Sequence, residues 1–333
     1  MSIIAKGRDK AIPEGLAELE ALYGDKTNGL VWPCVFSLPD WMSAWWRQFG
    51  WDFEPGIFII RDGGQLLGVA PFKCRGGVAS FIGDAAVCDY MDFIVIPGQE
   101  EAFSEALLKT CAMQGINRLE LGTLRPDSVA MRCVLPWARS HGFDVDVCDA
   151  DVSYEISLPT SYELYLEGLT PQQRREIWRK QRRLGALGKD NFRMLKGSEI
   201  NDGEIEAFLG LMAESRCDKA DFLTKEMRNY FKDMASAMAL CGLLRLGFLD
   251  IGKKTVAGVL GFDYNNVFYL YNSGYDPAYA EIGVGLLSKL AAVRWAIENQ
   301  KLVFDFLKGP EVYKERLGGR RIALMNGHLA TGS

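Results

Sequence analysis

The sequence predicts an α/β protein made of two tandem domains, each with a mixed, mostly antiparallel sheet flanked by helices. The chain has 333 residues, whereas a single hydrophobic core seldom grows beyond roughly 250 residues. The same order of hairpin, strand, helix and short strand occurs in both halves. Matching landmarks keep nearly the same separation: Gly64 and Gly252 in the turns, and Glu120 and Asp305 in the short strands. Duplication explains this agreement better than coincidence.

The first copy begins with a hairpin. Gly63-Gly64 separates two β-rich runs, and paired glycines favour the tight turns of hairpins. A third β-rich run, 90–96, ends at Pro97-Gly98 and predicts a strand. Helical spacing of apolar residues over 100–114 predicts a helix, and the short apolar run 117–122 predicts a further strand.

The second copy repeats this order. A turn at Gly252-Lys253 joins two β-rich runs, and a tight Asn265-Asn266 turn leads into a strand over 267–275. A helix is then predicted over 283–299 and a short strand over 302–309.

A helical connection lies between the copies. Thr170, Pro171 and Gln173 have the pattern of a capping box with proline at the first helical position. We interpret the basic face of the helix that follows as a solvated surface, or alternatively as a site for a phosphate-bearing substrate or an anionic membrane. Its cations are Arg174, Arg175, Arg179, Lys180, Arg182 and Arg183.

Two more helices, over 203–216 and 224–240, are predicted before the second hairpin. We place the domain boundary near residue 155, which gives an N-terminal domain of residues 1–155 and a C-terminal domain of residues 156–333.

Composition and missing motifs argue against several classes of protein. A formal net charge of −5 disfavours a general nucleic-acid binder, which needs a basic surface. Two histidines and no C-x-x-C pair predict that no metal is bound. The sequence has no G-x-S-x-G motif and no P-loop, which disfavours serine hydrolases and P-loop NTPases. Eight scattered cysteines, without a signal-peptide pattern or a membrane-spanning apolar run, predict a reduced cytoplasmic protein.

The start of the helix at residue 283 predicts an anion-binding loop. Gly283, Val284, Gly285 and Leu286 follow a strand and a loop rich in Tyr and Gly. Glycines let backbone amides approach an anion, and a helix N-terminus adds positive partial charge. We expect Gly285 to need a backbone angle that favours glycine. The bland alternative is two loop glycines before an ordinary helix. The matching first-copy helix begins with acids at 100 and 101, which would repel a phosphate.

A second cluster suits the acylation of an amine. Asp305, Glu311, Tyr313 and Lys314 lie within one predicted strand and the turn after it. Amine acylation needs a base for the ammonium proton and a donor for the thioester oxygen or the departing thiolate. The alternative is a charged surface junction without catalytic function.

Several segments resemble one protein family over nearly the whole chain. YNSGYDPAYAEIGVGLL and, farther on, FDFLKGPEVYKERLG resemble two motifs of the CelD-like, FemAB-related branch of the GNAT superfamily. FSLPDWMSAWWRQFG, VCDYMDF and LTPQQRREIWRKQRRL resemble that family's opening Trp-rich helix, an Asp-Tyr strand and a basic helix.

The resemblance implies two tandem GNAT domains, with acetyl-CoA or another acyl-CoA bound by the C-terminal copy without a metal. Gly283 to Leu286 then match the pyrophosphate loop, although Ala280 stands where that loop usually begins with Gln or Arg. Lys314 matches a lysine implicated in acyl transfer, and Asp305 matches the acid of the same motif. The family motifs also place substrate-binding residues at Asp89, Tyr90, Arg216, Tyr275 and Asp276.

The function expected from this resemblance is N-acyl transfer to a primary amine on an amino sugar or another cell-envelope or exopolysaccharide precursor. One alternative is a FemAB-like ligase that takes its amino acid from aminoacyl-tRNA, with the basic helix near the tRNA. The other is a non-catalytic module that binds a glycan or a partner. DNA is not an expected partner, and contact with an anionic membrane surface stays open.

Overall fold

The computed structural model describes residues 13–188 and 190–331, which form two compact units. The N-terminal unit comprises the chain up to Ala150 and again from Leu324 onward, and the C-terminal unit comprises Asp151–Ala323. Two strands therefore pass from one unit to the other along the chain, β6 (Val145–Ser157) and β12 (Arg320–Ala330). The boundary predicted near residue 155 places the rest of the chain in the second domain, whereas the chain from Leu324 lies with the first unit.

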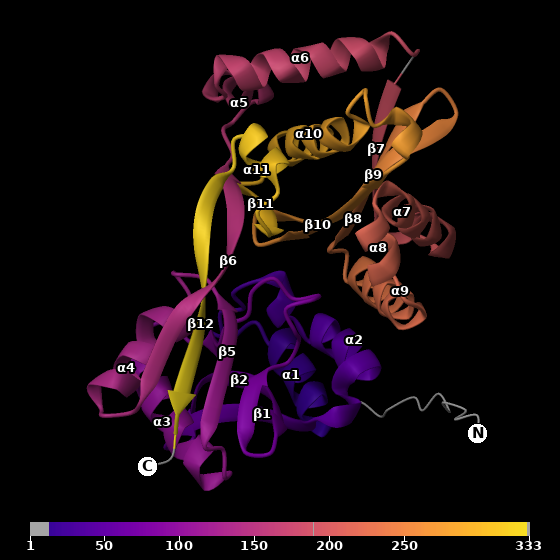
Figure 1. The fold of residues 1–333 in the computed structure, drawn as a ribbon. Coiled ribbons are helices and arrows are strands. Elements are labelled where there is room, and N and C mark those ends of the chain that lie inside the picture. Colours follow the sequence, from indigo (N-terminus) through magenta and orange to yellow (C-terminus); the bar gives the residue numbers. More distant parts are fainter. Residues whose placement is uncertain (1–12, 189, 332–333) are drawn as a thin grey trace, which may run out of the picture. The chain divides into compact units, whose positions relative to one another are not determined.

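The sheet of the N-terminal unit contains one parallel pair among antiparallel neighbours (Figure 1). Strands β1, β2 and β3 follow each other as antiparallel neighbours, β3 pairs in parallel with β5, and β12 closes the order antiparallel to β5. Helix α3 (Glu100–Met113) lies on the connection between β3 and β5. The strands are β1 (Glu54–Asp62), β2 (Gln65–Arg75), β3 (Val78–Phe81) and β5 (Arg118–Leu124).

The predicted strand over 90–96 is wrong for most of its length. Only β4 (Ile94–Val95) is a strand, paired with β2. Asp92 lies in a loop, where its carboxylate accepts hydrogen bonds from the amides of Val129 and Ala130 at 2.7 and 3.0 Å. A carboxylate that caps a neighbouring helical turn fixes the local backbone outside a sheet ladder.

Tryptophans dominate the apolar core of the N-terminal unit. Trp41, Trp45 and Trp46 are all buried on helix α2 (Pro39–Phe49), which the sequence pattern WMSAWW places on one face. The other helices of this unit are α1 (Glu14–Gly24) and α4 (Leu135–Ser140).

The C-terminal unit repeats the arrangement. Strands β8, β9 and β10 are antiparallel neighbours, β10 pairs in parallel with β11, and β6 lies antiparallel to β11. Helix α10 (Val284–Glu298) connects β10 to β11, as α3 connects β3 to β5 (Figure 1). The strands are β7 (Asp190–Lys196), β8 (Leu244–Ile251), β9 (Lys254–Tyr264), β10 (Val267–Tyr275) and β11 (Val303–Lys308).

The strand registers confirm the duplication. Glu120 of β5 stands opposite Ser80 of β3, and Asp305 of β11 stands opposite Tyr269 of β10, at the same step of the two parallel pairs. The chain therefore contains two tandem copies of one α/β unit.

The C-terminal unit contains the helices predicted after Thr170 and over 203–216 and 224–240, together with three short helices that the sequence did not predict, α5 (Tyr162–Gly168), α8 (Cys217–Phe222) and α11 (Val312–Arg316). The capping box at Thr170 is present, with the Thr170 hydroxyl accepting from the amide of Gln173. The predicted helices are α6 (Pro171–Gly185), α7 (Asp202–Ser215) and α9 (Lys225–Leu240). Within the described ranges, no helix is both long enough and apolar enough to cross a bilayer.

Candidate active site

The start of α10 presents backbone amides beside two cations of α6. Gly283 is the N-cap residue with a φ of 86°, and no side chain caps the helix there. A Cβ added to Gly283 would stand 2.5 Å from the Nζ of Lys180, so the lysine lies directly against this turn. Arg183 donates to the carbonyl oxygen of Glu281 at 3.2 Å. The helix dipole and the two cations together favour an anion at this position.

Glycine is needed at positions 283 and 285 of the loop for two different physical reasons. Gly283 has the left-handed backbone angle that favours glycine, whereas Gly285 lies in ordinary helical backbone, so the angle expected for Gly285 is wrong. A Cβ at Gly285 would meet the ring of Tyr275 at 2.9 Å, and glycine is therefore needed for packing. The amide of Leu286 already donates to Gly283 at 3.0 Å, so Val284 and Gly285 supply the helix-start amides without an intrahelical acceptor.

Asp305 and Lys314 hold the backbone where β11 ends. The Oδ1 of Asp305 accepts from the amide of Leu307 at 2.7 Å, and Leu307 has a φ of 62°. The Nζ of Lys314 donates to the carbonyl oxygens of Leu307, Lys308 and Gly309 at 2.9, 2.6 and 3.0 Å. Both side chains are buried, with 3% of Asp305 and 1% of Lys314 exposed. Their hydrogen bonds stabilise a left-handed turn that a non-glycine residue adopts at a cost.

Glu311 is the carboxylate nearest this turn. It forms an ion pair with Lys314 at 2.9 Å, and 45% of its side chain is exposed. Burial raises the pKa of Glu311, but attraction to Lys314 and Lys219 outweighs it, so this pKa lies below its usual value. Tyr313 is half-buried with its ring edge against Phe306 at 6.1 Å between centroids.

Lys289 connects the anion loop to the β11 turn, and the sequence analysis missed it. Its Nζ donates to the carbonyl oxygen of Gly285 at 2.8 Å and stands 4.6 Å from the centre of the Tyr313 ring. Burial and repulsion from Lys219 lower the pKa of Lys289 to about 7. The sequence carries a signal for it, because Ser288 and Lys289 stand between the apolar runs 284–287 and 290–293, and a buried polar pair is unusual.

Lys219 of α8 adds another cation to this cluster. Its Nζ donates to the Oδ1 of Asn272 at 2.9 Å and to the carbonyl oxygen of Ser273. Burial, with repulsion from Arg216, lowers the pKa of Lys219 to about 8. We define the lysine cluster as Lys219, Lys289 and Lys314, which share Glu311 as the acid that attracts them.

The predicted substrate residues are divided between the two units, with Arg216, Tyr275 and Asp276 in the C-terminal unit. Arg216 forms an exposed ion pair with Asp218 at 2.7 Å. Asp276 pairs with Lys254 at 2.7 Å and accepts from the amide of Ala278 at 2.9 Å, and the hydrogen bond from Lys254 lowers the pKa of Asp276. Tyr275 packs against Gly285 in the same unit.

Asp89 and Tyr90 belong to the N-terminal unit instead. Tyr90 is buried, with its ring edge against Phe36 and the Arg125 guanidinium 5.3 Å from its centre. The structure therefore brings Asp305, Glu311, Tyr313 and Lys314 together near α10 within the C-terminal unit.

The C-terminal site offers backbone amides and ammonium groups, which are ligands for an anionic substrate. Across residues 13–188 and 190–331, no group of three or more His, Cys, Asp or Glu side chains is arranged to hold a metal ion.

Comparison with known proteins connects this site to a protein family. Residues 171–315 match the acetyltransferase (GNAT) domain family, whereas no curated protein matches the chain. FemX is similar in structure, with a TM-score of 0.62, 12% identity and 96% of each chain covered. A conserved protein of unknown function from Bacteroides thetaiotaomicron has a TM-score of 0.61 and 15% identity, over 97% of this chain and 98% of its own. The C-terminal domain of a putative lysylphosphatidylglycerol synthetase from Agrobacterium fabrum has a TM-score of 0.56 and 9% identity, over 88% of this chain and 87% of its own.

At these identities the solved structures establish the fold alone. The topology of the two units, the matched GNAT domain and these structures agree with one another. Residues 171–315 therefore match the acetyltransferase (GNAT) domain family, and the fold of the chain is similar to that of FemX.

Proposed function

We propose that the C-terminal unit transfers an acyl group from acyl-CoA to a primary amine, such as that of an amino sugar or another envelope precursor. The observation that carries this proposal is the start of α10, where no side chain caps the helix and Lys180 and Arg183 of α6 lie against the turn at 281–283. GNAT domains are acyltransferases, and the matched domain includes both the anion loop and the β11 turn.

The donor's diphosphate is the anion that this loop suits. The amides of Val284 and Gly285 would donate to its oxygens, and Lys180 and Arg183 would neutralise its charge. Lys180 is well placed for this purpose, since burial already lowers its pKa and a bound anion would stabilise its ammonium form.

The acceptor amine must lose a proton before its nitrogen can form the new C–N bond. Lys289 is the group we assign to take it, because its pKa of about 7 leaves a neutral amine available near neutral pH. As the C–S bond breaks, the departing thiolate takes up a proton, for which the Tyr313 hydroxyl is the donor we favour. Asp305 and Lys314 would act as positioning residues, because their polar atoms already bond the backbone at 307–309.

A second candidate is transfer from aminoacyl-tRNA. It is favoured by the basic helix α6, on which Arg175, Arg179 and Arg182 are exposed and could contact a phosphate backbone. The likeness to FemX is compatible with both donors, since it shows the fold alone.

Calorimetric titration of acetyl-CoA into wild type and two variants tests the proposal. Lys180→Ala should weaken acetyl-CoA binding at least tenfold, because a charged contact to phosphate is lost. Arg175→Ala, on the same helix but exposed, is the matched control and should leave acetyl-CoA binding within twofold. If wild type binds no acetyl-CoA, and both substitutions weaken binding of a tRNA, the donor is a nucleic acid and the proposal is wrong.

A further inference from the structure

The N-terminal unit contains a cavity beside β3 and β5, the strands that correspond to β10 and β11 of the C-terminal unit. The cavity has a volume of about 270 Å³ and lies where the parallel strands β3 and β5 end, with residues of β12 completing the wall. Ligands of α/β proteins bind outside the carboxyl ends of parallel strands. This volume is at the small end for ligand sites and suits a molecule about the size of a monosaccharide.

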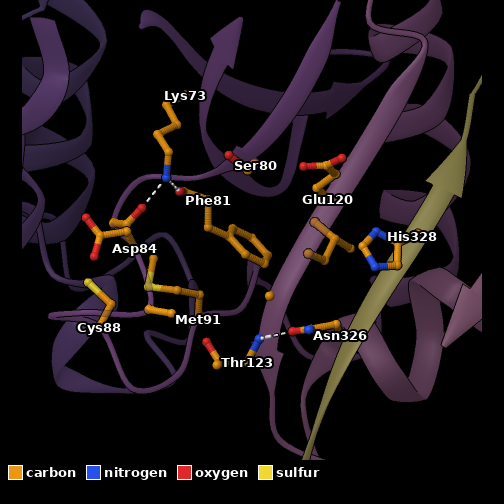
Figure 2. Close-up of a pocket in the computed structure, with 14 residues that line it drawn as sticks. Lys73, Ser80, Phe81, Asp84, Cys88, Met91, Glu120, Thr123, Asn326 and His328 are labelled. Carbon is orange, nitrogen blue, oxygen red and sulfur yellow. Dashed lines mark hydrogen bonds between the residues drawn. The ribbon is translucent and has the colours of Figure 1, made fainter. Parts of the chain in front are cut away.

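One wall of the cavity is fixed by the protein itself. Lys73 donates to the carbonyl oxygens of Phe81 and Gly83, and its ammonium stands 4.8 Å from the centre of the Trp45 ring. The Oδ2 of Asp84 accepts from the indole N–H of Trp45 at 3.0 Å. Figure 2 shows Lys73 turned toward these carbonyl oxygens. The Lys73 ammonium is therefore engaged by the backbone of this wall and is not assigned to a ligand.

The cavity also lacks a reactive nucleophile on this wall. Cys88 is buried, its Sγ accepts from the indole N–H of Trp41 at 3.1 Å, and burial raises its pKa to about 12. A thiol with that pKa stays protonated at neutral pH, so this wall suits binding rather than covalent chemistry.

The opposite wall offers polar groups for a ligand. Glu120 and His328 face each other in the β5–β12 register, and among the described residues the Nδ1 of His328 is buried without a hydrogen-bond partner. Asn326 accepts from the amide of Thr123 at 3.0 Å, which leaves its NH₂ group to donate. Thr123 has a φ of 50°, a strained angle of the kind that clusters at functional sites. Figure 2 shows these four residues along one side, with the Phe81 ring across from them.

These groups define the chemistry of the occupant. The Glu120 carboxylate is half-exposed and pairs with Arg118 of the same strand at 3.3 Å, and its second oxygen suits a protonated amine. His328, Asn326 and Ser80 suit hydroxyl groups. Phe81 and Met91 supply an apolar surface for the C–H face of a ring. We propose that this cavity is a second ligand site that binds a hydroxylated primary amine, with the dimensions and polarity of a hexosamine.

The proposal concerns binding within the N-terminal unit and goes beyond acyl transfer, so it is tested without an acyl donor. Glucosamine is titrated calorimetrically into the full chain, in parallel with N-acetylglucosamine and glucose, which lack the ammonium group. Glucosamine should bind at least tenfold more tightly than the other two sugars, because only it can pair with Glu120.

Two variants locate the site. Glu120→Gln should weaken glucosamine binding at least tenfold. Gly122→Leu should reduce it similarly by filling the cavity, and a Cβ there meets only the Oδ1 of Asn326 at 3.6 Å, so the fold should tolerate it. Glu101→Gln, an exposed acid on α3 outside the cavity, is the matched control.

Equal affinity for all three sugars, or no glucosamine binding, would overturn the proposal. Glucosamine binding that survives both cavity substitutions would also overturn it and would place the amine elsewhere, leaving acyl transfer by the C-terminal unit intact. Loss of binding in both variants, with the control unchanged, supports it.

Discussion

The ammonium group of Lys314 is engaged with three carbonyl oxygens and one carboxylate at once. A buried lysine in this position holds the loop around it. Its removal leaves buried carbonyl oxygens without a hydrogen-bond donor, and water cannot replace that donor. Asp305 holds the same turn from β11, because its carboxylate accepts a hydrogen bond from the amide of Leu307. Side chains of this kind influence catalysis by holding other groups in place.

We expect Lys314→Ala to lower both stability and turnover. The loss in the free energy of unfolding should be about 2–4 kcal/mol, because buried carbonyl oxygens lose their donor. Turnover should fall more than the Michaelis constant rises, since the displaced turn lies beside the reacting groups. Urea unfolding and steady-state kinetics measure both quantities. Lys253→Ala, which replaces an exposed lysine in a hairpin turn, is the control. A Lys314→Ala variant as stable as that control would show that Lys314 does not stabilise the turn at 307–309.

Lys289 should make activity depend on pH near neutrality. Its pKa is lowered from 10.5 to about 7, so the neutral amine that accepts a proton appears as pH rises through 7. Turnover should therefore rise across that range, and Lys289→Met should lower it by roughly 100- to 10,000-fold and remove the rise. A pH–rate profile that is unchanged in Lys289→Met would exclude this lysine as the base.

The lowered pKa of Lys289 also makes the free energy of unfolding depend on pH. Between pH of about 7 and 10.5 the unfolded chain binds a proton at Lys289 that the folded chain does not, so Lys289 makes stability increase with pH there. Lys289→Met should be more stable than wild type at pH 7, and this advantage should shrink toward pH 10. Urea unfolding at several pH values measures the difference.

At the residue scale, the sequence predicted which side chains lie close together but not which hydrogen bonds they form. The motif placed Asp305, Glu311, Tyr313 and Lys314 within one short segment, and the structure keeps them together. Their hydrogen bonds depend on the left-handed turn at Leu307, which nothing in a Phe-Leu-Lys run indicates. Lys289 was missed because its neighbours on α11 are distant in sequence.

At the scale of elements, side chains of α6 lie against the start of α10. The sequence predicted both helices from capping and spacing, and it gave a solvated face as the first interpretation of α6. In the structure the cations of α6 differ in their contacts. Arg174 donates to the carbonyl oxygens that end α5, and Lys180 and Arg183 contact the α10 loop. The other cations of α6 are exposed. Packing between helices depends on the whole fold and is not encoded in either helix alone.

We expect Gly283→Ala to weaken acetyl-CoA binding at least tenfold. A non-glycine residue at a φ of 86° costs about 1–2 kcal/mol, and its Cβ would displace Lys180 from the helix start. Calorimetry measures the affinity. Gly210→Ala is the matched control, because Gly210 lies in α7 with no atom within 4 Å of an added Cβ, and that variant should bind normally. Equal affinities in the two variants would mean that the diphosphate does not lie on this turn.

At the scale of the whole molecule, the two copies share a topology, but the N-terminal unit takes its last strand from the C-terminal end of the chain. The sequence revealed the duplication, since turns and short strands are local signals that repeat at one spacing. It did not reveal that the chain from Leu324 returns to the N-terminal unit, because strand pairing between distant segments leaves no local pattern.

We expect Leu329→Ala to destabilise the N-terminal unit by about 2–5 kcal/mol, the usual range for a buried leucine. Leu329 is fully buried on β12, opposite Leu119 of β5. Tryptophan fluorescence during urea unfolding reports this unit through Trp41, Trp45 and Trp46. Leu302→Ala, an exposed leucine of the C-terminal unit, is the control. An unchanged unfolding midpoint in Leu329→Ala would mean that β12 adds little to the N-terminal core.

The return of β12 also sets an order of events during protein synthesis. The ribosome produces β5 early, but its partner strand at residues 324–330 is made only after the whole C-terminal unit. Until then the nascent N-terminal half carries an unpaired strand edge with apolar neighbours, a state prone to aggregation. The C-terminal unit, whose strands all precede Leu324, can therefore complete its sheet first. The N-terminal sheet can therefore gain its last strand only after the C-terminal unit has been synthesised.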